Sequence, residues 1–522
     1  MSKQRQLLVL GLDGADFELI GDWLDEGDLP NLQKLIRRGT SGPLRSSRPP
    51  VTSPAWKCYS TGKNPANLGV FWWRQVDRNN RRIVGAEAGL FRGAEIWDYL
   101  GSAGYQSGVV GMPLTYPPKA IRGVMVAGDP YAREEGYTFP PEFRRFLEEK
   151  FSYRIRPRQL MSVKAGPQEE AVEEILRVIR QKFQVAGYFL ETGNFDFVHM
   201  TTFYLNHMQH TCWKGEPSRR AWKLVDEEVG KLVRPERNVI VMSDHGSREV
   251  KIEFYLNNWL LREGYLSLKI GTLAVLARRV KKIDRCNILK TLARGVLPRE
   301  FQRGVSDRLP TEATEAVPFE KCIDWERTRA IAMPQGTLYL TNCPYPDEYF
   351  KVRDEIIRKL EAVTDPEDGS KIINAIHKKE DIYQGRFFES APDLYVEARP
   401  DCHIREGTVG RKKLINPAEG WRATNYEFGI LIAAGPDIRA GREIDHARII
   451  DLAPTILHLM GVAVPEDMDG RVLEDIFAGE SGPAKRAVTS QPPLESGVYG
   501  AVPSGSGESE MKKKLQALGY LD

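Results

Sequence analysis

Residues able to bind a metal ion and to act as a nucleophile stand at three points of the sequence. Asp13 follows one apolar run, Asp244 and His245 follow another, and Thr52 lies in a Pro-Pro-Val-Thr-Ser-Pro-Ala-Trp segment. Two carboxylates, an imidazole and a hydroxyl form a suitable oxygen and nitrogen shell for zinc or a similar divalent cation. A metal in contact with Thr52 would lower the pKa of its hydroxyl and make it a nucleophile at neutral pH.

The segment around Thr52 predicts the beginning of a helix. Pro49 and Pro50 keep the preceding chain extended. Thr52 or Ser53 is suited to the N-cap, and Pro54 to the first helical position. The amides and the positive dipole end of such a helix favour an anion, above all phosphate. An ordinary capped helix is the alternative when this segment is taken alone, so its function depends on partners elsewhere in the chain.

Strand-like and helix-like segments alternate along the first half of the chain, and this rhythm returns near the end. The alternation favours an α/β fold with a mainly parallel sheet, whose ligands gather at the carboxyl ends of the strands. Asp13 and the Asp244-His245 pair lie at such ends. The expected strands are Leu7 to Leu12, Gly108 to Gly111, Phe195 to Thr201, Asn238 to Ser243 and Phe428 to Ala433, and the expected helices are Phe17 to Arg38, Gln168 to Leu190, Arg219 to Leu232 and Ile449 to Leu459.

The rhythm breaks near residue 251, which predicts an inserted region. Residues 269–308 are helix-prone and carry eleven Lys or Arg against three Asp or Glu, as a solvated helical face or a basic lid would. We expect a discontinuous core of residues 1–250 and 391–478 around a helical or mixed cap of residues 251–390, which includes strand segments at 330–340. A further strand is expected at 392–397. Residues 479–522 are expected to form a flexible tail with a short helix at 511–518.

Composition limits the class of protein. The chain has 522 residues, of which 41% are hydrophobic, and a net charge of +3, so no global field indicates nucleic acid. The six cysteines form no CxxC pair, which indicates reduced thiols. The first apolar run is too short for a signal peptide, and no stretch is long enough to span a membrane. The sequence therefore predicts a cytoplasmic protein.

The order of the motifs resembles the alkaline phosphatase superfamily. Gly-Leu-Asp-Gly, the Pro-Pro-Val-Thr-Ser-Pro segment, Val-Met-Ser-Asp-His-Gly and Gly-Ile-Leu-Ile-Ala-Ala-Gly-Pro are most similar to its type I phosphodiesterase/nucleotide pyrophosphatase branch. The resemblance implies a three-layer α/β sandwich acting on small phosphorylated substrates. It also implies that Asp13, Asp244 and His245 bind the metal that activates the nucleophile, and that Thr52 is that nucleophile, transiently phosphorylated.

The second metal site that the resemblance implies is altered. His210 matches one ligand, whereas Asn206 stands where the family has Asp and Asn425 where it has His. An amide oxygen brings no charge and is a poor zinc ligand. We therefore expect one firm site and a second that is weak, altered or absent, with His207 and His403 as alternative ligands.

Two adjacent tryptophans follow the expected nucleophile helix. Trp72 and Trp73 are candidates for stacking on a base or sugar of the substrate, with core packing as the alternative. The sequence thus predicts a metal-dependent phosphohydrolase, more phosphodiesterase than monoesterase. A phosphoryl transferase or phosphomutase of the same fold, and a weakened one-metal binding or regulatory protein, are the other hypotheses. Neither the substrate nor the oligomeric state follows from the sequence.

Overall fold

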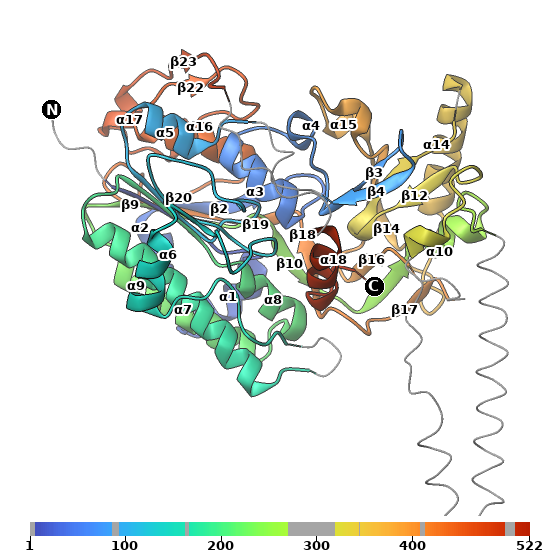
Figure 1. Cartoon of the computed structure of the whole chain (residues 1–522), viewed down its shortest axis with the longest axis horizontal. Coiled ribbons are helices and arrows are strands. Elements are labelled where there is room, and N and C mark those ends of the chain that lie inside the picture. Colours follow the sequence, from blue (N-terminus) through green and yellow to red (C-terminus); the bar gives the residue numbers. More distant parts are fainter. Residues whose placement is uncertain are drawn as a thin grey trace, which may run out of the picture.

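A computed structural model describes residues 6–85, 93–161, 166–269, 319–343, 345–407, 413–495 and 507–521. Its centre is a large sheet with strand order β20-β2-β19-β9-β1-β8-β5-β6-β7 (Figure 1). Strands β6, β5, β8, β1 and β9 run parallel, whereas β19 is antiparallel to both β9 and β2, and β7 to β6. The strands are β1 (Leu7–Gly11), β2 (Thr40–Arg45), β5 (Ser107–Val110), β6 (Gly123–Val126), β7 (Thr138–Phe139), β8 (Phe197–Thr201), β9 (Asn238–Met242), β19 (Phe428–Ala434) and β20 (Arg442–Glu443), with β21 (Ala447–Arg448) also paired to β2.

Helices cover both faces of the sheet, which gives the three-layer α/β sandwich that the sequence predicts (Figure 1). Alternate residues of β1 divide between the two apolar layers: Leu8 and Leu10 belong to one buried cluster, Leu7 and Val9 to the other. One layer contains α1 (Phe17–Asp25), α2 (Pro30–Arg38), α6 (Phe143–Phe151), α7 (Glu169–Glu191), α8 (Phe203–Cys212) and α9 (Glu216–Leu232), and the other contains α3 (Thr52–Thr61), α5 (Ile96–Ser102) and α16 (Leu452–Leu459).

A smaller mixed region, the cap, stands beside the core (Figure 1). Its sheets have the orders β12-β13-β15-β14 and β16-β11-β17, and the hairpin β3-β4 reaches it from the core. Its elements are β3 (Arg74–Asp77), β4 (Arg82–Gly85), β11 (Ile252–Tyr255), β12 (Ala330–Ala332), β13 (Thr337–Leu340), β14 (Ile373–Lys378), β15 (Leu394–Ala398), β16 (Cys402–Arg405), β17 (Ile415–Pro417), α10 (Leu256–Arg262), α13 (Phe319–Cys322), α14 (Pro346–Glu361) and α15 (Lys379–Ile382).

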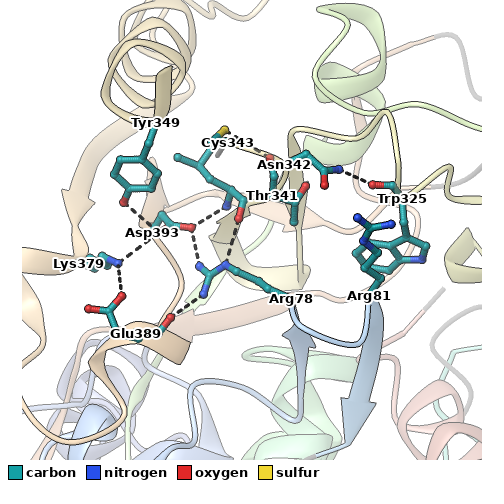
Figure 2. A pocket seen from close by; sticks show the side chains of 11 residues that line it. Arg78, Arg81, Trp325, Thr341, Asn342, Cys343, Tyr349, Lys379, Glu389 and Asp393 are labelled. Carbon is teal, nitrogen blue, oxygen red and sulfur yellow. Dashed lines mark hydrogen bonds and ion pairs between the residues drawn. The ribbon is translucent and has the colours of Figure 1, made fainter. Parts of the chain in front are cut away.

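A polar cavity of about 250 Å³ lies in the cap (Figure 2). Arg78 reaches across it to the carbonyl oxygens of Leu340, at 3.0 Å, and Ala391, at 2.9 Å, and pairs with Asp393. Tyr349 donates a hydrogen bond of 2.9 Å to Asp393 as well. The positively charged side chains that line the cavity already have carboxylate or carbonyl partners. The bonds of Arg78 therefore join the β3-β4 hairpin to the cap.

Several elements differ from the sequence predictions. The helix expected over residues 17–38 is two helices, because Gly27 adopts a positive φ of 80° and Pro30 begins a new helix. The strand region at residues 330–340 is a hairpin, β12-β13. The basic segment 269–308 lies outside the described residues except for Lys269.

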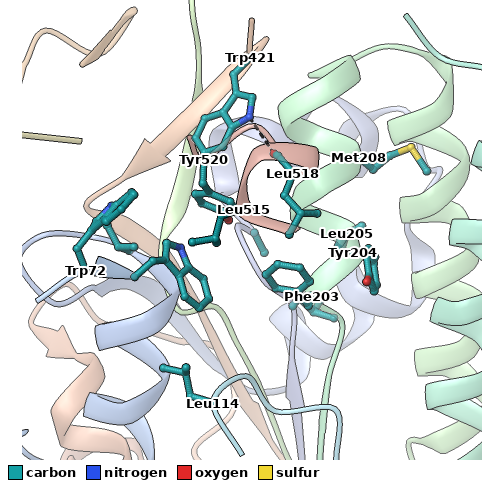
Figure 3. Packing of buried hydrophobic residues seen from close by; sticks show 14 of the residues in the cluster. Trp72, Leu114, Phe203, Tyr204, Leu205, Met208, Trp421, Leu515, Leu518 and Tyr520 are labelled. Atoms are coloured by element: carbon teal, nitrogen blue, oxygen red, sulfur yellow. Dashed lines mark hydrogen bonds between the residues drawn. The ribbon is translucent and has the colours of Figure 1, made fainter. Parts of the chain in front are cut away.

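The C-terminal segment, residues 507–521, contains a helix where the sequence predicts a short one, and it is packed against the rest of the chain. Its helix, α18 (Gly507–Ala517), lies between the core and the cap (Figure 1). Leu515, Leu518, Tyr520 and Leu521 are buried. Figure 3 shows the first three against Trp421, whose indole N–H donates a hydrogen bond of 3.2 Å to the Leu518 carbonyl. These apolar residues follow a long polar stretch, so a local composition window does not reveal their burial.

Candidate active site

The chemistry-bearing residues converge at the carboxyl ends of three neighbouring strands. Asp13 follows β1, Asp244 and His245 follow β9, and α8 follows β8. The Nε2 atom of His245 lies 3.2 Å from Oδ2 of Asp244 and 3.7 Å from Oδ1 of Asp13. One ligand atom from each of these three residues lies within 4.8 Å of the others. They are thus spaced to share a single cation.

Thr52 is the first residue of α3, with Val51 rather than Thr52 or Ser53 at the N-cap. This corrects the predicted cap: the Thr52 hydroxyl faces the strand ends instead of its own helix. Its Oγ1 atom is 3.2 Å from Nε2 of His245. Because Nδ1 of His245 lies 2.9 Å from the Gly246 carbonyl and donates to it, Nε2 presents a lone pair to Thr52 and the carboxylates.

The two carboxylates of this group are buried, and the described residues around them do not supply enough positive charge to neutralise both. Asp13, Thr52, Asp244 and His245 are all 0% exposed. Burial raises the pKa of Asp13 well above its usual range, the charge of Asp244 raises it further, and the Trp56 hydrogen bond opposes this. Burial likewise raises the pKa of Asp244, against the charge of His245. Two adjacent buried carboxylates are costly without a cation, so this group fits a divalent metal.

Hydrogen bonding leaves coordinating atoms of this group open. Oδ2 of Asp13 accepts a 3.0 Å hydrogen bond from the indole of Trp56, and Oδ1 of Asp244 accepts one of 3.2 Å from the Gly14 amide. The other oxygen of each carboxylate is buried and accepts no hydrogen bond from the described part of the chain. Each carboxylate is therefore held by one oxygen while the other is directed to the cation position.

The residues expected at the second metal site also have open polar atoms. Asn206 and His210 lie four residues apart on α8, and Asn425 lies on β18 (Ala423–Tyr426), which pairs with β10 (Gly246–Glu249) next to His245. Nδ1 of His210 lies 2.7 Å from the Ala423 carbonyl, so its Nε2 carries the lone pair. Among the described residues, no hydrogen bond reaches that Nε2 or the side-chain oxygens of Asn206 and Asn425, all buried.

A glycine lets Asn206 approach the first metal group. Gly14 has a φ of 72°, and a Cβ atom placed there would meet Oδ1 of Asn206 at 2.4 Å. The Asn206 side chain also acts on Asp13, lowering its pKa against the larger effect of burial. Asn206 therefore lies beside the Asp13 carboxylate, but with no charge to attract a second cation.

The proposed alternative ligands lie close by. Burial lowers the pKa of His210 most, and the nearby rings of His207 and His403 lower it further. His207 is buried, and neither ring nitrogen has a hydrogen-bond partner among the described residues. Nδ1 of His403 lies 2.9 Å from the Thr424 hydroxyl. A role for either ring as a metal ligand stays a prediction.

The tryptophan pair is buried. The indole N–H of Trp72 donates to Gln335 at 2.8 Å, which fixes this ring between core and cap. Trp73 makes edge contacts with Tyr131 and Tyr520 at centroid distances of 5.3 and 5.7 Å. Trp72 therefore serves packing in this conformation, while Trp73 contacts a residue of the site. The expected contacts of both rings with substrate stay predictions.

Tyr520 is a site residue that sequence reasoning missed. Its ring packs edge-on against Trp421 at 4.9 Å and His210 at 5.9 Å between centroids. Burial raises the pKa of its phenol well above the usual range, the Asp13 charge adds to this, and interactions with Thr52 and Asn206 oppose it. The signal in the sequence was the apolar pattern of Leu515, Leu518, Tyr520 and Leu521 after the polar stretch.

A buried ion network supports the nucleophile helix from behind. Lys57 of α3 donates a 2.8 Å hydrogen bond to Glu95, which also pairs with Lys119 at 2.8 Å. Burial alone would raise the pKa of Glu95, but the charges of Lys119 and Lys57 outweigh it and lower the pKa to about 2. The ion pair therefore fixes α3 to the start of α5.

The fold and the site together define a member of the alkaline phosphatase superfamily: a three-layer sandwich with an Asp-Asp-His group and a hydroxyl at a helix start. The type I phosphodiesterase / nucleotide pyrophosphatase family matches residues 7–421, and the chain belongs to it. The protein is therefore a phosphoric ester hydrolase by family, a class that uses metal ions and small phosphorylated substrates.

One solved structure shares the fold at low sequence identity, and a second is reported with it. Phosphonoacetate hydrolase from Sinorhizobium meliloti 1021, in complex with phosphonoformate, is 13% identical with a TM-score of 0.56, over 88% of this chain and 96% of that one. Human ectonucleotide pyrophosphatase / phosphodiesterase 5 is 14% identical with a TM-score of 0.49, over 91% and 100%. No curated protein sequence matches the chain.

None of the helices in the described ranges has the length and apolar character needed to cross a membrane. The five cysteines that the structure describes form no disulfide with one another.

Proposed function

We propose that this protein is a metal-dependent phosphodiesterase that works through a covalent phosphothreonine at Thr52. The observation that carries the proposal is the position of the Thr52 hydroxyl, 3.2 Å from Nε2 of His245 and beside two buried carboxylates. A hydroxyl at a helix start, facing a group that fits a cation, is arranged to attack phosphorus.

Asp13, Asp244, His245 and Thr52 would hold the ion, which we propose to be zinc. A bound divalent ion supplies Lewis acidity that favours the ionised form of a hydroxyl and neutralises charge on phosphate oxygens. The donor set of two carboxylates and a neutral imidazole suits zinc. At the second position, Asn206 and Asn425 supply amides in place of charged or imidazole ligands, so we propose weak binding or none.

Thr52 carries the chemistry in two displacements. Its hydroxyl gives its proton to solvent water, and Oγ1 forms a bond to phosphorus. The bond from phosphorus to the leaving oxygen breaks on the opposite side, and this oxygen takes a proton from water where it needs one. At the α3 helix start, Thr52 and Ser53 carry the backbone N–H groups that can meet the phosphoryl oxygens, because Pro54 has none and the Ala55 N–H bonds the Val51 carbonyl. Water then attacks phosphorus opposite Oγ1, the bond from phosphorus to Oγ1 breaks, a proton from the attacking water returns to Oγ1 through solvent, and the phosphomonoester product leaves.

The weakened second position supports a second candidate, phosphoryl transfer. Where water is poorly activated, another hydroxyl competes better for the phosphothreonine. A one-metal binding or regulatory protein of the same fold is the outcome left if neither reaction occurs. The predicted cytoplasmic location belongs to this proposal and rests on the sequence.

Hydrolysis by metal-stripped protein tests the proposal. Bis(p-nitrophenyl) phosphate and p-nitrophenyl phosphate are offered after addition of Zn, Mn, Mg or Ca, to wild type, Thr52→Ala and Thr61→Ala. Thr61 lies at the other end of α3 and donates a 2.6 Å hydrogen bond to the Lys57 carbonyl. We expect metal-dependent cleavage, faster for the diester, in wild type and Thr61→Ala but not in Thr52→Ala. Cleavage by Thr52→Ala at the wild-type rate, or none with any metal, would contradict the proposal.

A further inference from the structure

The C-terminal segment ends inside the active site. Residues 507–521 form α18 and a final turn, and the ring of Tyr520 lies among Trp73, His210 and Trp421, at centroid distances of 5.7, 5.9 and 4.9 Å. His210 belongs to the altered second metal position. Burial raises the pKa of the Tyr520 phenol most, and Asp13, Thr52 and Asn206 also affect it. The turn after α18 thus contacts the altered second metal position through His210.

This is the space that a substrate needs. Phosphorus must come within bonding distance of Thr52 Oγ1, and the leaving group must lie on the far side of phosphorus from that oxygen. With Tyr520 in place, Thr52 is 0% exposed, and the open polar atoms of Asn206 and His210 are buried from solvent. The Tyr520 ring, packed against His210, therefore fills space beside the second metal position that a phosphodiester would approach.

The segment is attached by contacts that reverse without unfolding the core. The main sheet contains no strand from residues 507–521. Lys512 pairs with Glu320, Lys514 donates to the Ala132 carbonyl at 3.2 Å, and Trp421 donates to Leu518. Leu515 and Leu518 bury their side chains in the same cluster (Figure 3). Its withdrawal exposes these apolar residues but breaks no strand pairing.

The aromatic side chains around Tyr520 indicate which kind of substrate group can replace its ring. His210 stacks on Trp421 with centroids 3.7 Å apart and planes within 8°, and Tyr520 meets both rings edge-on. Trp73 closes the other side. Such walls favour a flat aromatic ring through edge and stacking contacts.

We propose that the C-terminal segment is an intramolecular competitor of substrate, and that Tyr520 occupies the subsite for an aromatic group esterified to phosphorus. This inference rests on the proposed phosphodiesterase function. Tyr520 is then a specificity-determining residue: a substrate is selected by its ability to displace this ring and replace its contacts. An aryl phosphodiester fulfils that requirement better than an alkyl one of similar size.

Steady-state kinetics on the full chain tests the competition. For bis(p-nitrophenyl) phosphate, we expect Tyr520→Ala and Leu518→Glu to lower KM by about 10-fold at unchanged kcat, because an occluded site raises the apparent KM by the inverse of its open fraction. Ala517→Glu is the matched control, since position 517 is exposed on the same helix. A lower kcat in Tyr520→Ala would instead make Tyr520 part of the catalytic machinery and overturn the proposal, as would an unchanged KM in both tail variants.

Tryptic release of the segment is a second readout, independent of turnover. Lys512, Lys513 and Lys514 lie within α18, and we expect trypsin to cleave after them faster once the helix leaves its docked position. In Thr52→Ala, excess bis(p-nitrophenyl) phosphate should speed cleavage there severalfold, and dimethyl phosphate should do so much less. Equal or slower cleavage with the aryl diester would overturn the competition. Absence of Thr52-dependent hydrolysis from wild type and all tail variants would instead count against the proposed function itself.

Discussion

The Nε2 atom of His245 lies 3.2 Å from the hydroxyl oxygen of Thr52, although the two residues are 193 positions apart. One follows a central strand and the other begins a helix on one face of the sheet. The Gly246 carbonyl fixes the tautomer that directs the His245 lone pair to this hydroxyl. The same nitrogen faces Asp13 and Asp244, so nucleophile and cation ligands share one position.

Removing a carboxylate charge should empty the first metal position. Asp244→Asn keeps the shape of the side chain but removes half of the anionic charge of the group, so we expect at least a 100-fold loss of zinc affinity and loss of hydrolysis. The measurement is zinc content after dialysis against a competing chelator. Zinc retained at the wild-type level would show that the ion binds elsewhere.

Restoring charged and imidazole ligands should create a second metal position. Asn206→Asp with Asn425→His supplies the donors that zinc prefers, next to the lone pair of His210. We expect the zinc stoichiometry to rise from about one to about two per chain in the double variant, with each single variant closer to wild type. Two tightly held ions in the unmodified protein would contradict our assignment of one firm site.

The indole of Trp56 is expected to tune the metal position through Asp13. Trp56→Phe removes the 3.0 Å hydrogen bond to the carboxylate, and loss of such a supporting partner lowers metal affinity by about 10–100-fold. Trp97→Phe is the control, because the Trp97 indole N–H is buried without an acceptor in the described ranges. Equal zinc affinities of Trp56→Phe and Trp97→Phe would show that Trp56 does not support the metal position.

The ion network behind α3 should contribute pH-dependent stability. The folded pKa of Glu95, about 2, lies below its ordinary value of 4.5, so its contribution is complete above pH 4.5 and is lost as the pH falls toward 2. Glu95→Gln leaves Lys57 and Lys119 buried with less compensation, and we expect a loss of about 3–5 kcal/mol in unfolding free energy at pH 7.

Denaturant unfolding between pH 7 and 3 measures both effects. The stability of wild type should fall more steeply below pH 4.5 than that of Glu95→Gln. Glu227→Gln, which breaks an exposed pair with Lys231 on α9, is the comparison and should leave the midpoint nearly unchanged. Parallel pH profiles for wild type and Glu95→Gln would contradict the assigned pKa.

The fold was predictable because its information is local. A buried strand such as β9 is a continuous apolar run, and the residue after it lies at the sheet edge where ligands gather. This places Asp13 and Asp244 from the sequence alone. The break between α1 and α2 depends on the backbone of Gly27, and the cap of α3 on whether the Thr52 hydroxyl bonds its own helix or faces His245, which local sequence does not decide.

The packing of Tyr520 at the site was not predictable, because it depends on contacts between residues far apart in the sequence. Tyr520 and Thr52 are far apart in sequence, and the polar stretch before α18 indicates disorder by composition. Only the packed structure shows that Trp421 and Trp73 receive the tyrosine ring. The position of Trp72 also depends on a long-range contact, its hydrogen bond to Gln335 in the cap. Its neighbours in the sequence do not indicate this contact.

Trapping the covalent intermediate tests the central claim most directly. Protein loaded with zinc is mixed with bis(p-nitrophenyl) phosphate, quenched in acid within the first turnover and digested for mass spectrometry. We predict a p-nitrophenylphosphoryl group on the peptide that contains Thr52, located on that residue by fragmentation and absent from Thr52→Ala. Hydrolysis that proceeds with no adduct on Thr52 at any quench time, or an adduct on another residue, would contradict the account.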